Sequence, residues 1–299
     1  MANWIYFSLI AQGIWAFTSL IDKIVISKGY IKSPFVYIIS NGLMNLGLIF
    51  LMPFVGFKPL KFMDFLIALF SGLMLSASVI AYYKAVQYDE ISKIKIMFQM
   101  EPILVLMLSF IFLGNVLTKN QFIGFIFLIC AGIIISYKKE KKLFKLSKAF
   151  YPAVLSIFFG ALYVISAKHI YSITGFWSAF LWLRLTSLSA LFVLIAPSIR
   201  KEFAKTIKQI NKKVRKLLLF KMIIDFSAFI FAGYALLNGP VSLVVVLESA
   251  VAPLFIFILT LLTTIYLPRI IKEEVNKKAI LTKLFAIIST ILGLIFVNL

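Results

Sequence analysis

The residues best suited to chemistry are few, and each stands near the middle of a long apolar stretch. A carboxylate in such a place can carry a proton or bind an amine, whereas a guanidinium keeps its charge and needs an anion. Arg184 therefore requires a negative partner, either Asp225 or Glu248 of the chain itself or the carboxylate of a bound molecule. We favour the internal ion pair and keep the bound carboxylate as the alternative. The full set of such residues is Asn41, Glu101, Arg184, Asp225 and Glu248.

One proline in each half of the chain is expected to kink a helix. Pro102 and Pro253 each remove a backbone donor and free a carbonyl group one turn earlier, which at membrane depth is tolerated where it lines a cavity or is capped. Glu101 stands beside the first of them. It is either an acid that carries a proton or a structural carboxylate hydrogen-bonded across the kink, and the sequence leaves both readings open.

Several aromatic residues could form the walls of a cavity while offering a polar tip. We select Trp15, Tyr83, Tyr163 and Tyr234 as cavity-lining candidates, and Gln99 as a weaker one. The competing interpretation for any single aromatic residue is a place in the interfacial belt or in the packing between helices.

The composition identifies the environment in which these residues must work. The chain has 299 residues, of which 62% are hydrophobic and 14% charged, and its mean hydropathy is +1.04. A soluble fold of this size could not bury so much apolar surface, so we predict an all-α integral membrane protein. A helix that crosses a bilayer needs about 20 apolar residues. Ten such stretches lie near 3–21, 34–56, 62–86, 91–113, 119–137, 149–170, 174–197, 217–238, 240–266 and 280–298.

The net charge of +20 is distributed unevenly over the connecting segments. With ten spans, 26 of the 31 Lys and Arg residues fall on one side, including a basic tether predicted over 200–216. This bias is typical of the cytoplasmic side, which would place both termini outside. A nucleic-acid partner is disfavoured because no basic groove interleaved with aromatic residues is present.

The residue types needed for other functions are scarce. His169 is the only histidine and Cys130 the only cysteine, so neither a metal site nor a disulfide is expected. The sequence has no glycine-rich phosphate loop and no nucleophile elbow, and we predict neither an enzyme nor a bound cofactor. A channel is disfavoured because no filter-like segment is visible.

Two halves of the chain repeat the same order of features. Residues 81–118 and 232–265 each run from a tyrosine-containing span end through a short polar link into an apolar span with one proline. The spacing from Trp15 to Lys23 equals that from Gly160 to Lys168. Five spans per half would invert the second half relative to the first, as in many secondary transporters. We therefore predict two inverted five-helix repeats, 1–142 and 143–299.

These features resemble the drug/metabolite transporter superfamily, in particular its EamA-type members. The resemblance is carried by the starts 15–23 and 162–168, the A-V-Q-Y-x-x-I-S stretch over 85–92, the Glu101–Pro102 pair, and Leu113–Gly114 before Thr118. The chain departs from the family pattern at Asn115, where an acidic residue is usual, and at Ala252, which replaces the glutamate of the Glu–Pro pair. The resemblance implies a central cavity lined by the first, third, fourth, sixth, eighth and ninth helices. It also implies cytoplasmic termini, against the charge count.

The resemblance further implies that the fifth and tenth helices hold the repeats together. Small residues on these spans would allow close approach. They are Gly124, Ala131 and Gly132 on the fifth span and Ala286, Ser289 and Gly293 on the tenth.

Together these observations predict a secondary transporter that works by alternating access around a central cavity. We expect a monomer in the plasma membrane that exports a small amphipathic metabolite such as an amino acid. The alternative is a non-transporting membrane scaffold or a partner of a lipid-linked sugar flippase.

Overall fold

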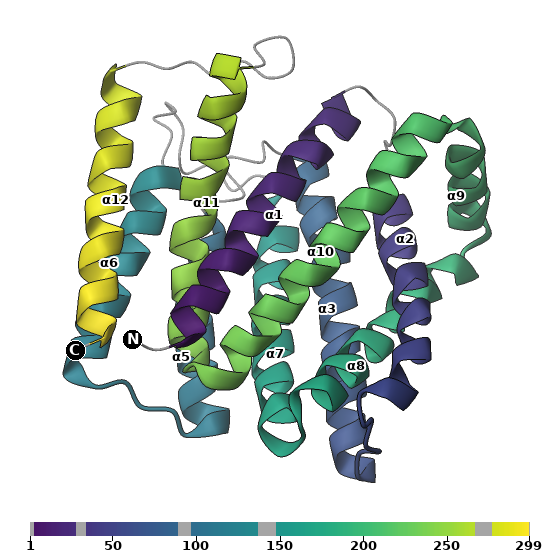
Figure 1. Ribbon diagram of the computed structural model, residues 1–299, viewed down its shortest axis with the longest axis horizontal. Coiled ribbons are helices and arrows are strands. Elements are labelled where there is room, and N and C mark those ends of the chain that lie inside the picture. Colours follow the sequence, from purple (N-terminus) through teal and green to yellow (C-terminus); the bar gives the residue numbers. More distant parts are fainter. Residues whose placement is uncertain (1–2, 28–33, 89–96, 137–147, 267–276, 299) are drawn as a thin grey trace.

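The computed structural model describes residues 3–27, 34–88, 97–136, 148–266 and 277–298, and regular structure in these ranges is helical throughout. Within them lie eleven α-helices and two 3-10 helices (Figure 1). Their bounds are α1 (Asn3–Ser27), α2 (Pro34–Leu46), η1 (Gly47–Phe54), α3 (Phe62–Tyr88), α5 (Glu101–Leu113), α6 (Lys119–Ser136), α7 (Phe150–Ile173), α8 (Phe176–Thr186), η2 (Ser187–Ile195), α9 (Pro197–Gln209), α10 (Lys212–Asn238), α11 (Val241–Tyr266) and α12 (Lys277–Asn298).

Six helical segments of the described chain are long and apolar enough to cross a membrane. They belong to α1, α3, α7, α8 with η2, α10 and α11. Shorter apolar helices lie at 42–54, 101–113, 119–131 and 287–297, which are the sites of the remaining predicted spans. The prediction of an all-helical, multi-pass membrane protein is therefore confirmed.

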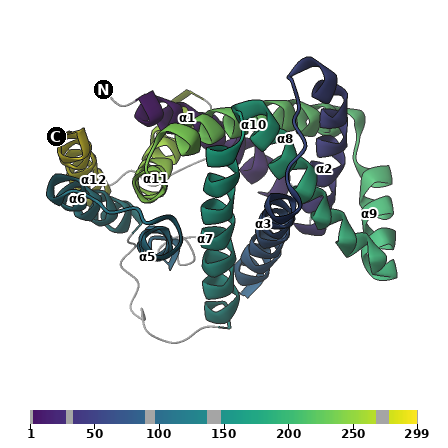
Figure 2. The ribbon, with the colours of Figure 1, turned by 90° about the horizontal axis from the view of Figure 1, so that it is seen from below.

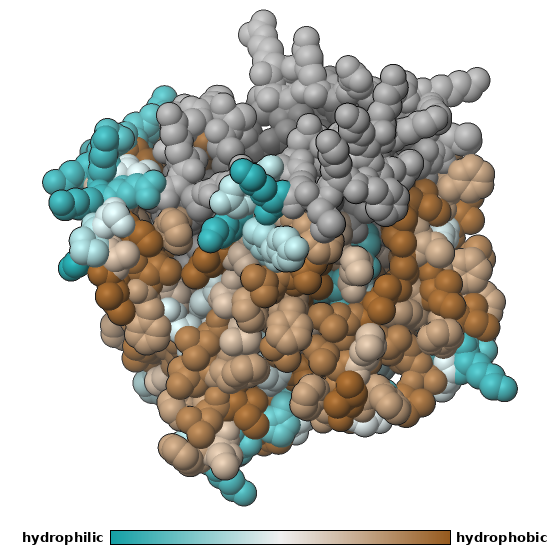
Figure 3. Space-filling view, turned by 180° about the vertical axis from the view of Figure 1, so that it is seen from behind, coloured by the Kyte–Doolittle hydropathy of each residue, from teal (hydrophilic) through white to brown (hydrophobic). Residues whose placement is uncertain are grey.

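The surface of the molecule is apolar over a broad belt. Phe50 and Phe54 are 80% and 83% exposed, and Phe62 and Val116 are 73% and 74% exposed. Figure 3 shows hydrophobic residues covering the middle of the face that it presents, with hydrophilic residues gathered towards its edges. Apolar exposure on this scale is typical of contact with lipid rather than with water.

The second and seventh predicted spans both change from α-helix to 3-10 helix partway along. In the second, α2 continues into η1, and in the seventh, α8 continues into η2. A 3-10 helix rises ~2.0 Å per residue against ~1.5 Å for an α-helix, so each combined segment is roughly 35 Å long. That length exceeds the hydrocarbon thickness of about 30 Å.

The basic segment after η2 is a helix rather than the predicted tether. Pro197 occupies the first turn of α9, where its missing N–H is not needed. Phe203 and Ile207 are four residues apart and share one face, which packs against a buried cluster of Ile21, Val25, Ile210 and Val214. This helix was not predicted because its charges dominate the composition, although its apolar residues recur with helical spacing.

Helices α6 and α12 pack along each other at one edge of the molecule (Figure 1). A methyl group added at Gly124 would lie 2.7 Å from the carbonyl oxygen of Gly293, and the Ser289 hydroxyl donates to the carbonyl of Phe127 at 2.7 Å. The predicted close contact between these two spans is therefore confirmed. Gly132 and Ala286 lie outside the residues whose side chains are described.

The other helices form a bundle that positions the polar residues. Helix α3 runs along α7, and α1 runs along α10. Helix α11 contacts α1, α5 and α6, while α5 also contacts α7. Seen from below, α7 lies between a group containing α5, α6, α11 and α12 and a group containing α2, α3, α8 and α9 (Figure 2).

The two prolines occupy different positions in their helices. Pro102 lies in the first turn of α5, which begins at Glu101, and residues 91–96 of the predicted span lie outside the described residues, so the kink at this position stays a prediction. A turn at 99–100 separates α5 from the preceding helical residues, and proline is well tolerated in such a first turn. Pro253 lies inside α11, as the sequence predicts.

Candidate functional site

A cavity of about 120 Å³ lies between α2, α3, α8, η2 and α10. Hydrophobic side chains form much of its wall, including Leu75, Val79, Phe226 and Phe229. Its polar lining consists of Asn45, Ser76, Arg184, Ser187 and Asp225. Two of the five polar residues selected from the sequence, Arg184 and Asp225, therefore line the same cavity.

Arg184 is the cation of this cavity, and it is only 6% exposed. Its Nη2 donates to the hydroxyl of Tyr163 on α7 at 2.9 Å. The ring of Phe229 lies beneath the guanidinium, with 4.0 Å between its centroid and Cζ. Nε of Arg184 is buried without a hydrogen-bond partner in the described part of the chain. The guanidinium thus has aromatic and hydroxyl neighbours but retains a donor for an additional acceptor.

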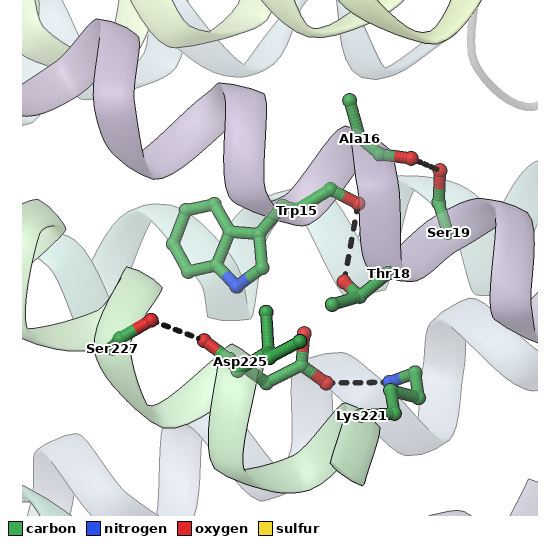
Figure 4. A network of polar contacts seen from close by, with 8 residues as sticks. Trp15, Ala16, Thr18, Ser19, Lys221, Asp225 and Ser227 are labelled. Carbon is green, nitrogen blue, oxygen red and sulfur yellow. Dashed lines mark hydrogen bonds and ion pairs between the residues drawn. The ribbon is translucent and has the colours of Figure 1, made fainter. Parts of the chain in front are cut away.

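Asp225 forms its ion pair with a residue of its own helix (Figure 4). Nζ of Lys221, one turn earlier on α10, lies 2.5 Å from Oδ2 of Asp225. Among the described residues Arg184 has no carboxylate within ion-pair distance. The expected internal ion pair of Arg184 is therefore not formed here, because the Lys221 side chain already neutralises Asp225.

The remaining polar groups of the cavity bind mainly to one another. Nδ2 of Asn45 donates to the hydroxyl of Ser187 at 2.8 Å, and that hydroxyl donates to the carbonyl of Arg184 at 2.6 Å. The hydroxyls of Ser76 and Ser189 lie 3.0 Å apart. These contacts hold α2 and α3 against η2 and fix the polar side of the wall.

Three of the predicted aromatic residues lie in or beside this region. Trp15 of α1 meets the ring of Phe229 edge to face at 5.2 Å, so it supports the residue that covers the guanidinium. Figure 4 shows its indole above the segment of α10 that carries Asp225. Tyr163 binds Arg184 directly, whereas Tyr234 stacks on Phe176 at 3.7 Å.

Glu101 and Glu248 lie outside the lining of this cavity, on the neighbouring helices α5 and α11. Glu101 reaches α7, where a Cβ added at Gly160 would lie 2.8 Å from its Oε1. Glu248 on α11 is close enough to Glu101 for the two carboxylates to repel each other. Gln12 and Ser8 of α1 lie beside Glu248, but no hydrogen bond of ordinary geometry reaches its Oε1.

Three predicted site residues are less informative. Asn41 and Tyr83 fall outside the residues whose side chains the structure describes. Gln99 is buried in the turn before α5.

Two lysines of structural importance were missed by the sequence analysis. Lys221 was counted with the basic surface residues, although its spacing of four residues from Asp225 on one helix was a readable signal. Lys168 donates to the carbonyls of Leu236, Leu237 and Gly239 at 2.6, 3.0 and 2.9 Å. It therefore caps the C-terminal end of α10, a tertiary contact that local spacing cannot reveal.

Comparisons with known proteins agree with this architecture. One protein of known crystal structure has a similar fold, with a TM-score of 0.70. The superposition covers 99% of this chain and 97% of that protein chain. The sequence identity is 14%, so the likeness shows a shared fold alone. Among curated proteins, none matches the chain significantly in sequence. A sequence model of the EamA-like transporter family matches residues 2–137. The first part of the chain is therefore similar to the EamA-like transporter family.

Proposed function

We propose that this chain is a secondary transporter of a small amphipathic metabolite bearing a carboxylate, such as an amino acid. It exports this substrate across the plasma membrane by alternating access around a central cavity. The observation that carries the proposal is the buried guanidinium of Arg184, which lines a cavity and pairs with no carboxylate among the described residues.

The chemistry of the cavity favours an anionic group on the substrate. A buried guanidinium cannot lose its proton, so its charge must be balanced by a partner. Asp225 and Lys221 neutralise each other, which leaves Arg184 as the uncompensated charge of the lining. A substrate carboxylate would accept a charge-assisted hydrogen bond from Nε of Arg184.

The size and the walls of the cavity favour a small amphipathic molecule. About 120 Å³ corresponds to the liquid volume of about four water molecules. Leu75, Val79 and Phe226 offer an apolar surface opposite the charged groups. A larger side chain would require the cavity to open, which is the motion expected in alternating access.

The contacts between helices support two inverted repeats, 1–142 and 143–299. If α1, α3 and α5 correspond to α7, α10 and α11, then the contact of α3 with α7 is mirrored by that of α10 with α1. The contact of α5 with α7 is likewise mirrored by that of α11 with α1. Both repeats also contain one span that changes from α-helix to 3-10 helix. Paired halves of this kind are suited to rocking around a shared site.

The proposal is tested first by ligand binding to the purified chain. A molecule that binds only the folded state raises the melting temperature, by an amount that grows with its concentration relative to Kd. We expect a stabilising amino acid within a panel that also contains the matching amines, which lack the carboxylate. Stabilisation by the amines alone would contradict a role for Arg184 in binding a carboxylate.

Transport is tested by counterflow of the selected ligand in proteoliposomes. Arg184→Lys keeps the charge but loses the planar donor geometry, and we expect roughly ten- to hundredfold weaker apparent affinity. Arg200→Lys, on the exposed face of α9, is the matched control and should behave as the wild type. If the folded wild-type chain catalyses no flux of any ligand that stabilises it, the scaffold alternative is favoured instead.

A further inference from the structure

Two acidic side chains on neighbouring helices lie outside the lining of the cavity around Arg184. Glu101 lies in the first turn of α5, and Glu248 lies about two turns into α11, which packs on α5. Their carboxylates act on each other electrostatically. We call these two residues the carboxylate pair.

The immediate surroundings of the carboxylate pair are neutral. On the side of Glu101, a Cβ at Gly160 would meet its Oε1 at 2.8 Å and the hydroxyl of Ser78 at 3.3 Å, so the absent side chain provides room for the carboxylate. That hydroxyl is already engaged, since it donates to the carbonyl of Ser156 at 2.8 Å. On the side of Glu248, the neighbours are Gln12 and Ser8.

Two polar atoms in these surroundings lack hydrogen bonds among the described residues. Oε1 of Glu248 and the hydroxyl of Ser8 are both buried, and neither has a hydrogen-bond partner in the described part of the chain. A buried carboxylate oxygen without a donor is unfavourable if the group is ionised. A proton on the carboxylate would turn one oxygen into a donor and allow it to bind a neighbouring acceptor such as Ser8 or Gln12.

The charged and titratable groups on the helices packed around the carboxylate pair are engaged elsewhere or lie at the surface. On α7, Tyr163 binds Arg184, Lys168 binds backbone carbonyls, and His169 lies 3.5 Å from Asp64. On α10, Lys221 is paired with Asp225. The other charged or titratable side chains described on these helices and on α3 are Tyr6 on α1, Tyr82, Lys84 and Tyr88 on α3, Lys119 and Cys130 on α6, Tyr151 and Tyr171 on α7, and Lys212, Lys213, Arg215, Lys216 and Tyr234 on α10. None of these is a charged neighbour of Glu101 or Glu248.

Two carboxylates in a region of low dielectric constant cannot both stay ionised without a cation, because burial and mutual repulsion both disfavour the second charge. We propose that Glu101 and Glu248 together bind a proton and that its uptake and release couple transport to the proton gradient. This inference rests on the proposed transport function, but it assigns a separate site. The proton binds at the interface of α5 and α11, and the substrate binds at Arg184.

Proton binding is measured directly, without any transport. Infrared spectra of the purified protein are recorded through a pH titration, and a protonated carboxyl group gives a carbonyl band that disappears as the pH rises. We expect this band in the wild type and in Glu202→Gln, a matched control on the exposed face of α9. We expect its loss in the double variant Glu101→Gln, Glu248→Gln. A band that persists unchanged in the folded double variant overturns the proposal.

A gentler variant tests the geometry without removing either acid. Gly160→Ala would push a methyl group against Oε1 of Glu101, which lies at the end of a flexible side chain and can move aside. We expect the protein to fold and the carbonyl band to titrate at a different pH from that of the wild type. An unchanged titration in this variant, with the band intact in Glu101→Gln, removes Glu101 from the site and overturns the paired assignment.

The coupling itself is measured in proteoliposomes by comparing two modes of transport. Accumulation driven by a pH gradient should be lost in Glu101→Gln and in Glu248→Gln, whereas counterflow without a gradient should be retained. Wild-type accumulation driven by a sodium gradient and indifferent to pH would overturn the proposal. Absence of wild-type counterflow would reject the transport function, whereas the infrared titration would still report whether the carboxylate pair binds a proton.

Discussion

The partly buried acids of this bundle have two different kinds of surroundings. Asp225 has Lys221 at 2.5 Å within α10, so its charge is balanced inside one helix. Glu101 and Glu248 come from two helices that pack on each other, and the groups described around them are neutral. The first arrangement is a neutral pair whose charges need no ligand, whereas the second changes its charge only by binding a cation from outside the chain.

The cations show the same contrast. Lys168 is satisfied by three carbonyls at the end of α10, and Lys221 is satisfied by Asp225. Arg184 has a tyrosine hydroxyl and an aromatic face, but no carboxylate among the described residues. The groups with a complete set of partners are thus structural, and those with an incomplete set are the candidates for binding substrate and proton.

The largest expected effect comes from breaking the neutral pair. Lys221→Met leaves Asp225 buried without a cation, and we expect the free energy of unfolding to fall by about 3–5 kcal/mol. The measurement is equilibrium unfolding in mixed detergent micelles. The double variant Lys221→Met, Asp225→Leu removes both charges and should recover most of this loss. A single variant as stable as the wild type would show that Asp225 has another cation and would remove the contrast between the two regions.

A smaller loss is expected from Lys168→Met. This change removes three charge-assisted hydrogen bonds, but water can reach part of the exposed end of the helix, so we expect a loss of about 2 kcal/mol. Amide hydrogen exchange should rise at the start of α11 and the end of α10, where the bonds are lost. Lys119→Met, at the exposed start of α6, is the control and should leave stability unchanged. An equal effect of both variants would show that the contacts of Lys168 contribute nothing specific.

The sequence predicts the positions of the helices better than it predicts the partners of their charged residues. In the described part of the chain, each of the ten apolar stretches contains a helical segment, because the length and hydropathy of a span are local properties. The contact between α6 and α12 was also predictable, since Gly124 and Gly293 mark faces where backbones approach closely. In contrast, the change from α-helix to 3-10 helix after α2 and α8 leaves no mark in composition.

The partners of Arg184 and Glu248 illustrate why the site was less predictable. Tyr163, Phe229 and Gln12 come from three different helices, so their contacts depend on how each helix is rotated in the bundle. The sequence identifies Arg184 as a group that needs an anion, but it cannot show that Lys221 already neutralises the nearest candidate. The spacing of Lys221 and Asp225 was visible, but its meaning depended on placing Lys221 inside the bundle rather than at its surface.

The smallest expected effect on stability is that of a substitution in the carboxylate pair. This substitution can be compared directly with the same change at Asp225. Glu248→Gln keeps the shape of the side chain and removes only its acidity. Because Oε1 has no hydrogen bond to lose, and Gln12 and Ser8 can accept from the new amide, we expect stability to change by less than about 1 kcal/mol. Equilibrium unfolding at neutral pH provides the measurement.

The same acid-to-amide change at Asp225 is the internal control. Asp225→Asn leaves Lys221 buried opposite a neutral group, so it should cost several times more than Glu248→Gln, about 3 kcal/mol. Equal costs at the two positions would mean that Glu248 also has a cation close by, and the carboxylate pair would then be an ordinary ion-pair network. A large cost at Asp225 with a small one at Glu248 is expected only if one acid is ionised and balanced while the other already holds a proton, since an amide imitates a protonated carboxyl group and not a carboxylate.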